Sequence, residues 1–515
     1  RGVDLQRLYG LRSVLGLFEM DDPSSESLKV QLLNCFISPH FLGDKTGMKF
    51  LVHVFSMSGA MMHYVHDAIK NQIPYAKKSV LVCYGELYFS VWSACGDNAA
   101  AQSHFETKCL QNLFEHAIHA RKEVFKNVMR VLSPIHEHKR DSKQQSGEMD
   151  AMLLRLYGPI LWRSFKVANA TVRRNSIVLL ADLFPLQDSS LTQHSEIEAL
   201  STRQHDAFRD ALMDPSPEVR VVAIEGASRV LGTYWEIVPE NYKKDYINCF
   251  VKKLVYDQSS WAVRAAVFDG LNFVLDNRLC HSVMKHVLPA LAPFIHDKSE
   301  RVRTKMLDML LQVKRIRDIQ FYDVVPVEDL LERLAEDAKR PALAKKLTSL
   351  LLNSYFPDNK GVRERLSRAK TLMEQNPPAA VAFYSNLRQH VAVSDVCSLL
   401  DALNKCMVTI LKHMGTKQGS GSRKRSLGAG DDVQDSSSTE ALKSHATKVL
   451  LLLHVITGTW ESISKDLSKR GGAKAAEYLR AALSGDFCDD ARAGLEGFFS
   501  PGIVEALLCR LAALL

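Results

Sequence analysis

Apolar residues recur at helical spacing along most of the chain. After Val219 they fall at Val222, Ala223, Gly226, Ala227, Val230 and Leu231, and the same spacing follows Val263. Steps of three and four residues place such a set on one face of an α-helix. Comparable stripes occupy residues 28–96, 361–414 and 440–515. The pattern therefore predicts an all-α protein built from amphipathic helices.

A short polar signature opens several of these helices and returns at a regular interval. It reads Asp-Pro-Ser-Pro-Glu-Val-Arg at 214–220, and its Val-Arg pair recurs in four copies ending at Arg173, Arg220, Arg264 and Arg303. Successive copies lie 47, 44 and 39 residues apart, which is the interval of HEAT and armadillo repeats. The sequence therefore predicts a HEAT-repeat α-solenoid, a superhelical array of antiparallel helix pairs.

The chain is predicted to divide into five segments, which differ in how closely they follow the repeat pattern. Residues 415–439 are rich in Gly, Ser, Lys and Asp and contain too little apolar surface to fold, so a disordered loop is predicted there. The other four segments are N-terminal helical repeats at 1–150, well-formed HEAT repeats at 151–360, a further helical repeat at 361–414, and helical repeats at 440–515 that we expect to continue past the end of the sequence.

Charge, cysteine content and the length of apolar runs limit the partners and the kinds of site that the chain is expected to have. Lys and Arg number 66 against 58 Asp and Glu, a net charge of +8 that permits a polyanionic partner without demanding one. The ten cysteines include no CxxC pair, which predicts neither a disulfide framework nor a zinc site. The longest apolar run, 449–456, is far shorter than the ~20 residues that span a bilayer, so no membrane partner is expected.

Residues suited to catalysis are not found in any recognisable arrangement. His63, His66, His136 and His138 lack the HExxH spacing of a zinc-binding helix, and we interpret them as ordinary surface side chains. A His-Glu pair occurs once, at 136–137, in a segment that we interpret as a polar loop. Phosphate-loop, dinucleotide and nucleophile-elbow motifs are missing from the sequence. We therefore expect no catalytic residue, metal, cofactor or small-molecule substrate.

The recurring arginines have a structural interpretation. In HEAT arrays the arginine of the signature usually reaches the aspartate of a signature and forms a ladder between repeats. The predicted members of this ladder are Asp214, Arg220, Asp257, Arg264, Asp297 and Arg303. Direct contact of these arginines with a ligand is the alternative.

Basic residues outside the ladder suggest a partner. They cluster at 163–174 and 301–370, and basic residues that recur in successive repeats would line up as a stripe that suits a phosphate backbone. A merely solvated face is the alternative reading. The candidate nucleic-acid-binding residues are Arg163, Lys166, Arg174, Lys305, Lys314, Arg315, Arg317, Lys345 and Lys346.

Several runs resemble one family beyond the general HEAT pattern. The runs include Tyr-Gly-Pro-Ile-Leu-Trp-Arg at 157–163, Tyr-Trp at 234–235 and Leu-Asp-Asn at 275–277. Residues 28–460 closely resemble the G-type HEAT subunit of condensin II, and the last stretch matches less distinctly.

This resemblance implies a non-catalytic regulatory subunit. Its partners would be the condensin II kleisin subunit and double-stranded DNA or chromatin, with microcephalin as a possible regulator. It would act in mitotic chromosome condensation and segregation, in the nucleus and on chromosomes. The alternatives from the repeat itself are a HEAT or armadillo nuclear transport receptor and a generic scaffold for protein complexes.

Overall fold

The computed structural model describes residues 2–141, 146–188, 191–421, 434–467 and 486–495, together with 499, 504–506 and 508–509. Within this described part of the chain the regular elements are helices, and no residue forms a β-strand. None of the described helices is both long and apolar enough to cross a membrane. The predicted all-α HEAT-repeat fold is confirmed.

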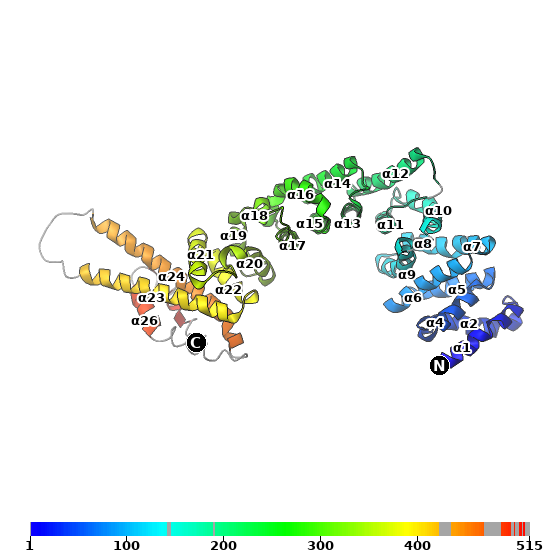
Figure 1. The fold of residues 1–515 in the computed structure, drawn as a ribbon, viewed down its shortest axis with the longest axis horizontal. Helices are drawn as coiled ribbons and strands as arrows, with labels where there is room; N and C mark the ends of the chain where they lie inside the picture. The colour runs from blue at the N-terminus through cyan, green and yellow to red at the C-terminus, as the bar shows by residue number, and fades with distance from the viewer. Residues whose placement is uncertain are drawn as a thin grey trace. The chain divides into compact units, whose positions relative to one another are not determined.

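The chain divides into two compact units, Arg1–Asn277 and Arg278–Leu515. In the first unit the helices stack along the chain, and the most extensive contacts join α6 with α9, α11 with α13, and α13 with α15 (Figure 1). Its α-helices are α1 (Gly2–Gly10), α2 (Glu26–Ile37), α3 (Pro39–Leu42), α4 (Lys45–Ser56), α5 (Gly59–Gln72), α6 (Lys78–Ala94), α7 (Ala99–Phe105), α8 (Gln111–His119), α9 (Lys122–Asp141), α10 (Ser146–Ser164), α11 (Ala170–Leu183), α12 (His194–Leu212), α13 (Pro217–Tyr234), α14 (Glu240–Lys252) and α15 (Trp261–Val274). Shorter turns are η1 (Arg12–Leu17), η2 (Pro23–Ser25), the π-helical η3 (Glu106–Leu110) and η4 (Leu254–Tyr256).

The second unit continues the same construction. Its α-helices are α16 (His281–Val287), α17 (Glu300–Val313), α18 (Phe321–Val324), α19 (Val327–Glu336), α20 (Pro341–Tyr355), α21 (Val362–Gln375), α22 (Pro377–Asn386), α23 (Val393–Gly421), α24 (Gln434–Leu467) and α26 (Asp486–Leu495). Its short helical turns are η5 (Arg278–Cys280), η6 (Leu288–His296) and η7 (Leu387–Gln389).

The segment boundaries inferred from the repeat pattern stay predictions. In the predicted loop at 415–439, α23 extends to Gly421 and α24 begins at Gln434, so helix enters the segment from both sides. The middle of this segment, 422–433, lies outside the described residues.

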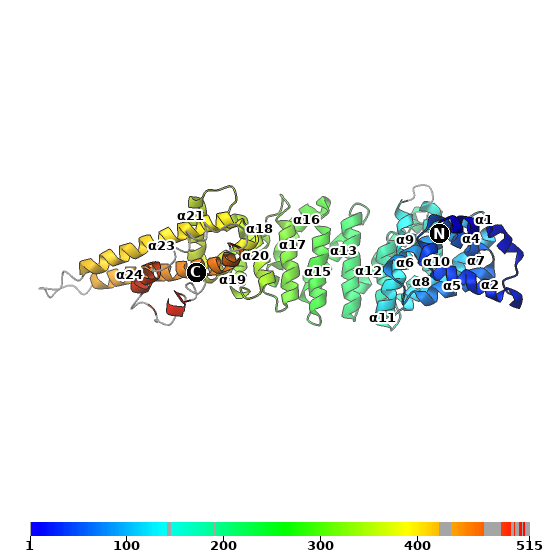
Figure 2. The same ribbon diagram turned by 90° about the horizontal axis from the view of Figure 1, so that it is seen from below.

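In the first unit, α6, α9, α11, α13 and α15 form one layer of parallel helices. Near the start of α9, Asn127 donates to the carbonyl of Ile73, just before α6, at 3.0 Å. At the other end of the pair, the rings of Phe89 and His138 stack with centroids 3.6 Å apart. Figure 2 shows the matching side-by-side arrangement of α13 and α15. Because the helices are parallel, their N-terminal ends share one edge of the layer.

Two glycines show how closely neighbouring helices approach in this unit. A Cβ added to Gly85 of α6 would lie 2.3 Å from the carbonyl oxygen of Val131 and 2.7 Å from the ring of Pro134. The backbone of α9 cannot move aside as a flexible side chain could. A Cβ added to Gly158 of α10 would meet nothing nearer than Trp162 Nε1, at 3.7 Å. The two positions therefore form a matched pair.

We predict opposite effects for alanine at these two glycines. Gly85→Ala should lower the free energy of unfolding by about 1–3 kcal/mol, because the added methyl group overpacks the α6–α9 contact. Gly158→Ala should leave it unchanged or raise it by up to about 1 kcal/mol, because alanine has the higher helix propensity. Urea unfolding followed by circular dichroism measures both. Equal effects would show that the approach at Gly85 is not a packing constraint.

Candidate nucleic-acid interface

The signature arginine of each repeat binds in two directions. Arg173 donates from Nη1 to the carbonyl oxygens of Val167 and Ala168, at 2.8 and 2.7 Å, in the loop before its own helix. Its Nε and Nη2 donate to the two carboxylate oxygens of Asp214 at 2.7 and 2.9 Å. Asp214 opens the next repeat, so one guanidinium joins two repeats. The hydrogen bond to Asp214 raises the pKa of Arg173.

Arg220 makes the next connection in the same way. It donates to the carbonyl of Asp214 at 2.6 Å, and its Nη2 lies 2.8 Å from Oδ2 of Asp257. Asp257 also accepts from the N–H groups of Ser259 and Ser260, each at 2.9 Å. Burial acts to raise the pKa of Asp257, but the hydrogen bonds of Ser259 and the charge of Arg220 outweigh it, and the pKa is lowered. The carboxylate therefore fixes its own loop and the preceding arginine.

The third predicted connection involves residues of different units. Within the first unit, Arg264 donates from Nη1 to the carbonyl of Asp257 at 2.8 Å. Within the second unit, Asp297 accepts from the N–H of Ser299 at 2.7 Å, and its carbonyl accepts from Arg303 at 2.7 Å. Each aspartate and arginine thus has the same role in its own loop as in the neighbouring copies.

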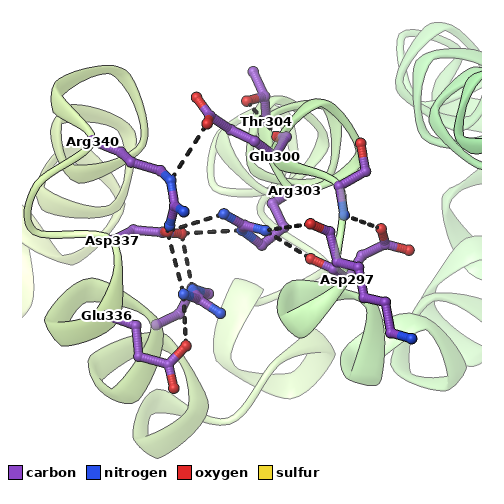
Figure 3. Close-up of polar contacts among 10 residues, drawn as sticks. Asp297, Glu300, Arg303, Thr304, Glu336, Asp337 and Arg340 are labelled. Carbon is purple, nitrogen blue, oxygen red and sulfur yellow. Dashed lines mark hydrogen bonds and ion pairs between the residues drawn. The ribbon is translucent and has the colours of Figure 1, made fainter.

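Arg303 binds an aspartate that the sequence analysis did not assign to the ladder. Its Nε and Nη2 donate to the carboxylate of Asp337 at 3.1 and 3.0 Å (Figure 3). Arg333 lies 2.8 Å from the same carboxylate, and Arg340 also donates to it. Asp337 is fully buried. The arginines are balanced further by Glu336, 2.6 Å from Arg333, and by Glu300, 3.4 Å from Arg340.

The three candidate nucleic-acid-binding residues of the first unit lie around α10 and α11. Arg163 is exposed and lies 3.5 Å from Glu115, and Lys166 is exposed in the turn after α10. Arg174 is half-buried, with its guanidinium 5.5 Å from the ring centroid of Phe125. Arg163 and Lys166 are therefore accessible to a phosphate, whereas Arg174 partly packs against the helix layer.

The six candidates of the second unit differ in their exposure and in the contacts that they make within the protein. Lys314 donates to the carbonyl of Ser349 at 2.6 Å, and burial lowers its pKa. Lys346 lies 2.6 Å from Asp308. The remaining candidates are half-buried Lys305 and exposed Arg315, Arg317 and Lys345. The exposed three are the candidates of this unit that a polyanion could reach most readily.

Lys314 and Lys345 share their surroundings with His390. The ring of His390 lies 3.0 Å from the carbonyl oxygen of Lys345. Burial lowers the pKa of His390, and the charges of Lys345 and Lys314 lower it further. The structure thus brings these two lysines, 31 positions apart in the sequence, to one site.

A second group of cations was missed by the sequence analysis. Lys77 and Lys78 lie at the start of α6, and Arg121, Lys122 and Lys126 lie at the start of α9. All five are exposed. Because α6 and α9 are parallel, the five side chains share one edge, which we call the cationic edge. The available signal was a pair of adjacent basic residues where each helix begins, but only the parallel packing places the two pairs together.

Cations at these helix ends are electrostatically costly for the fold itself. A helix N-terminus carries roughly half a positive charge, and its unpaired N–H groups favour anions over cations. Glu123 offsets part of the charge, 3.3 Å from Lys126. The cationic edge is therefore a surface where an anion would be stabilised by side chains and helix ends together.

A cleft of about 1280 Å³ opens between α10, α11 and α12. It exceeds the roughly 300–1,000 Å³ of pockets that enclose a small molecule. The guanidinium of Arg203 covers the ring of Trp162, 4.4 Å from the centroid. The residues that line the cleft include the apolar Leu154, Ile177 and Leu200 and the charged Arg163, Lys166, Asp206 and Asp210.

The interpretation of the histidines as surface side chains is wrong for two of them. His66 and His136 are only 2% and 1% exposed, and His136 lies within α9, not in a polar loop. Each buried ring finds a tyrosine hydroxyl from a neighbouring helix. The pairs are His66–Tyr88 at 2.7 Å, His136–Tyr157 at 3.1 Å and, in addition, His205–Tyr246 at 2.9 Å. These rings hold adjacent helices together.

Comparison with protein families and sequences places the chain among condensin II subunits. Residues 34–188 match the family described as condensin II non structural maintenance of chromosomes subunit. The chain is 32% identical over 476 residues to condensin-2 complex subunit G2 of Mus musculus, covering 92% of this chain and 40% of that protein. The Xenopus laevis protein of the same name is 30% identical over 528 residues, covering 98% of this chain and 45% of that protein. The chain thus spans about two fifths of the mouse relative.

Solved structures resemble the chain less closely. Importin beta matches 93% of this chain and 63% of its own, with 12% identity and a TM-score of 0.34. A structure of the Pds5-Scc1 complex matches 99% of this chain and 93% of its own, with 12% identity and a TM-score of 0.34.

We predict that Asp337 is the most sensitive residue of the ladder. Asp337→Ala leaves Arg303 buried without its counter-charge and leaves Arg333 with Glu336 alone, and should lower the free energy of unfolding by about 3–5 kcal/mol. Glu336→Gln, at a carboxylate whose side chain is 52% exposed, should change it by no more than about 1 kcal/mol. Denaturant unfolding of both variants measures the difference. A small effect at Asp337 would mean that water reaches the cluster.

The stability of the first unit should fall as the solution is acidified. Burial lowers the pKa of His205 from 6.5 to about 4. Between these values the unfolded chain binds a proton that the folded chain does not, so stability is present above pH 6.5 and is lost as the pH falls toward 4. The loss amounts to about 3 kcal/mol. Unfolding of wild type and His205→Asn from pH 7 to 4 should show a shallower dependence in the variant, and parallel curves would contradict the assignment.

Proposed function

The chain belongs to the family of G-type HEAT subunits of condensin II, and from this premise we propose that it is a non-catalytic region that binds the kleisin subunit and double-stranded DNA. The chain spans about two fifths of its mouse relative, so partners of the whole subunit come to it as proposals. The observation that carries the DNA proposal is the cationic edge. Its lysine and arginine side chains lie at helix N-termini, where the helix dipole disfavours positive charge, so they do not stabilise the fold there.

Duplex DNA fits this surface through its backbone. Exposed lysine and arginine side chains on successive parallel helices give a row of cations at the spacing of a helix layer, which suits phosphates and not base edges. The N-terminal ends of α6 and α9 add N–H donors to the same row. Arg163 and Lys166 in the first unit, and Arg315, Arg317 and Lys345 in the second, provide further exposed cations. Binding of this kind has little sequence preference.

The kleisin segment requires a different surface. An extended peptide gains most of its affinity from a few apolar or aromatic anchors in well-packed pockets. The cleft between α10 and α12 is lined by apolar side chains, by Trp162 and by charged groups of both signs. We propose that an anchor residue of the kleisin occupies this cleft, with the peptide continuing across neighbouring repeats.

Such a subunit acts by positioning its partners. Binding of both kleisin and DNA would hold the duplex at the complex during condensation and segregation of mitotic chromosomes, in the nucleus and on chromosomes. Energy for the process would come from other subunits. Microcephalin is a possible regulator under the same proposal.

We predict that charge reversal on the cationic edge weakens DNA binding equally for all sequences. Lys77→Glu with Lys78→Glu should reduce the dependence of log affinity on log salt by about 0.9 for each phosphate that the variant no longer neutralises. The fold should be retained, because glutamate is favoured at a helix N-terminus. Fluorescence anisotropy with two duplexes of unrelated sequence, across a salt range of roughly 50 to 200 mM, measures both quantities.

The matched control is Lys244→Glu with Lys285→Glu, which changes the net charge equally at exposed positions of other helices. It should bind DNA nearly as wild type does. Equal weakening in the two double variants would reduce the effect to net charge and overturn the cationic edge. Weakening confined to one duplex would instead indicate base readout.

A further inference from the structure

Three side chains with metal-binding donor atoms converge on the surface of the second unit. They are His296, the last residue of η6, and Asp329 and Glu332 of α19. One donor atom from each residue lies within 4.8 Å of the other two. The side chains of His296 and Glu332 are exposed, and that of Asp329 is half-buried.

The backbone beneath these donors is firmly anchored. Phe294 and Ile295, directly before the histidine, are buried, as are Leu330 and Leu331 between the two acids. Asp329 and Glu332 are three positions apart, so they lie on the same face of α19. The elements η6 and α19 also contact each other directly. Rotations of these three side chains would bring their donor atoms to a common ion.

The electrostatics of the group favour a cation. Two carboxylates three positions apart on a helix repel each other. One divalent ion balances their combined charge, and the neutral imidazole adds a nitrogen ligand at no cost in charge. Three protein ligands with water in the remaining position is a common arrangement for zinc.

We propose that His296, Asp329 and Glu332 bind one divalent transition-metal ion of the zinc class. The imidazole discriminates against Mg²⁺ and Ca²⁺, which take oxygen ligands. The ion would connect η6 to α19 and so tie the loop before α17 to the helix that carries Arg333 toward Asp337. Its effect is therefore to stabilise the second unit.

The test uses the whole chain and Zn²⁺ itself. Isothermal titration should show one site in wild type that is abolished, or weakened at least about tenfold, in His296→Gln and in Glu332→Gln. His286→Gln, an exposed histidine on α16 of the same unit, is the matched control and should retain the site. Mg²⁺ and Ca²⁺ at the same concentration should not compete.

Thermal unfolding separates metal binding from a structural role of the same residues. Zn²⁺ should raise the melting temperature of wild type and of His286→Gln, and should not raise that of His296→Gln. Without metal, Glu332→Gln should melt at the wild-type temperature or slightly above it, because one of two repelling charges is removed. Equal zinc binding in wild type and His296→Gln, or an absence of zinc binding in wild type, would overturn the proposal.

Discussion

One hydrogen-bonding arrangement recurs between repeats that begin with the signature. An arginine near the start of a helix donates to carbonyl oxygens of its own loop and to the aspartate of the following repeat, as Arg173 does with Asp214. Apolar packing between helices is not directional and would permit neighbouring repeats to slide or rotate. The bidentate arginine–carboxylate bond is directional, so it sets the orientation of one repeat on the next. The parallel alignment of α11, α13 and α15 depends on this orientation.

The two candidate binding surfaces lie on different helices of the first unit. The cationic edge exists because α6 and α9 run parallel, which brings basic residues from separate parts of the sequence to one line. The cleft lies on the other helices of the first unit, where α10 and α12 flank α11 and leave space around Trp162. A duplex and a peptide could therefore occupy the unit together, one through charge and the other through apolar anchors.

Much of the architecture could be predicted from the sequence, because the interval between repeats can be counted directly from the recurring residues. The Val-Arg copies identify the helices, and the recurrence of Arg173, Arg220 and Arg303 at one position indicates a shared structural role. Asp337 was harder to assign to the ladder, because no Val-Arg pair follows it in the sequence. The burial of His66 and His136 was not predictable from spacing, since their tyrosine partners lie on other helices. For the same reason, sequence clustering did not distinguish Lys346, paired with Asp308, from exposed Lys345.

The residues of the cluster around Asp337 should differ in how well they tolerate substitution. Three guanidinium groups meet at one carboxylate, so each arginine is one of several donors, whereas the acceptor is single. Replacing Arg340, which also reaches Glu300, removes one donor and leaves the carboxylate hydrogen-bonded by two others. Replacing the aspartate removes the one carboxylate that all three arginines share, and leaves them with Glu336 beside Arg333 and Glu300 beside Arg340. A substitution of one arginine should therefore be tolerated better than a substitution of the aspartate. A related sequence could vary at the arginines one at a time while the aspartate remained.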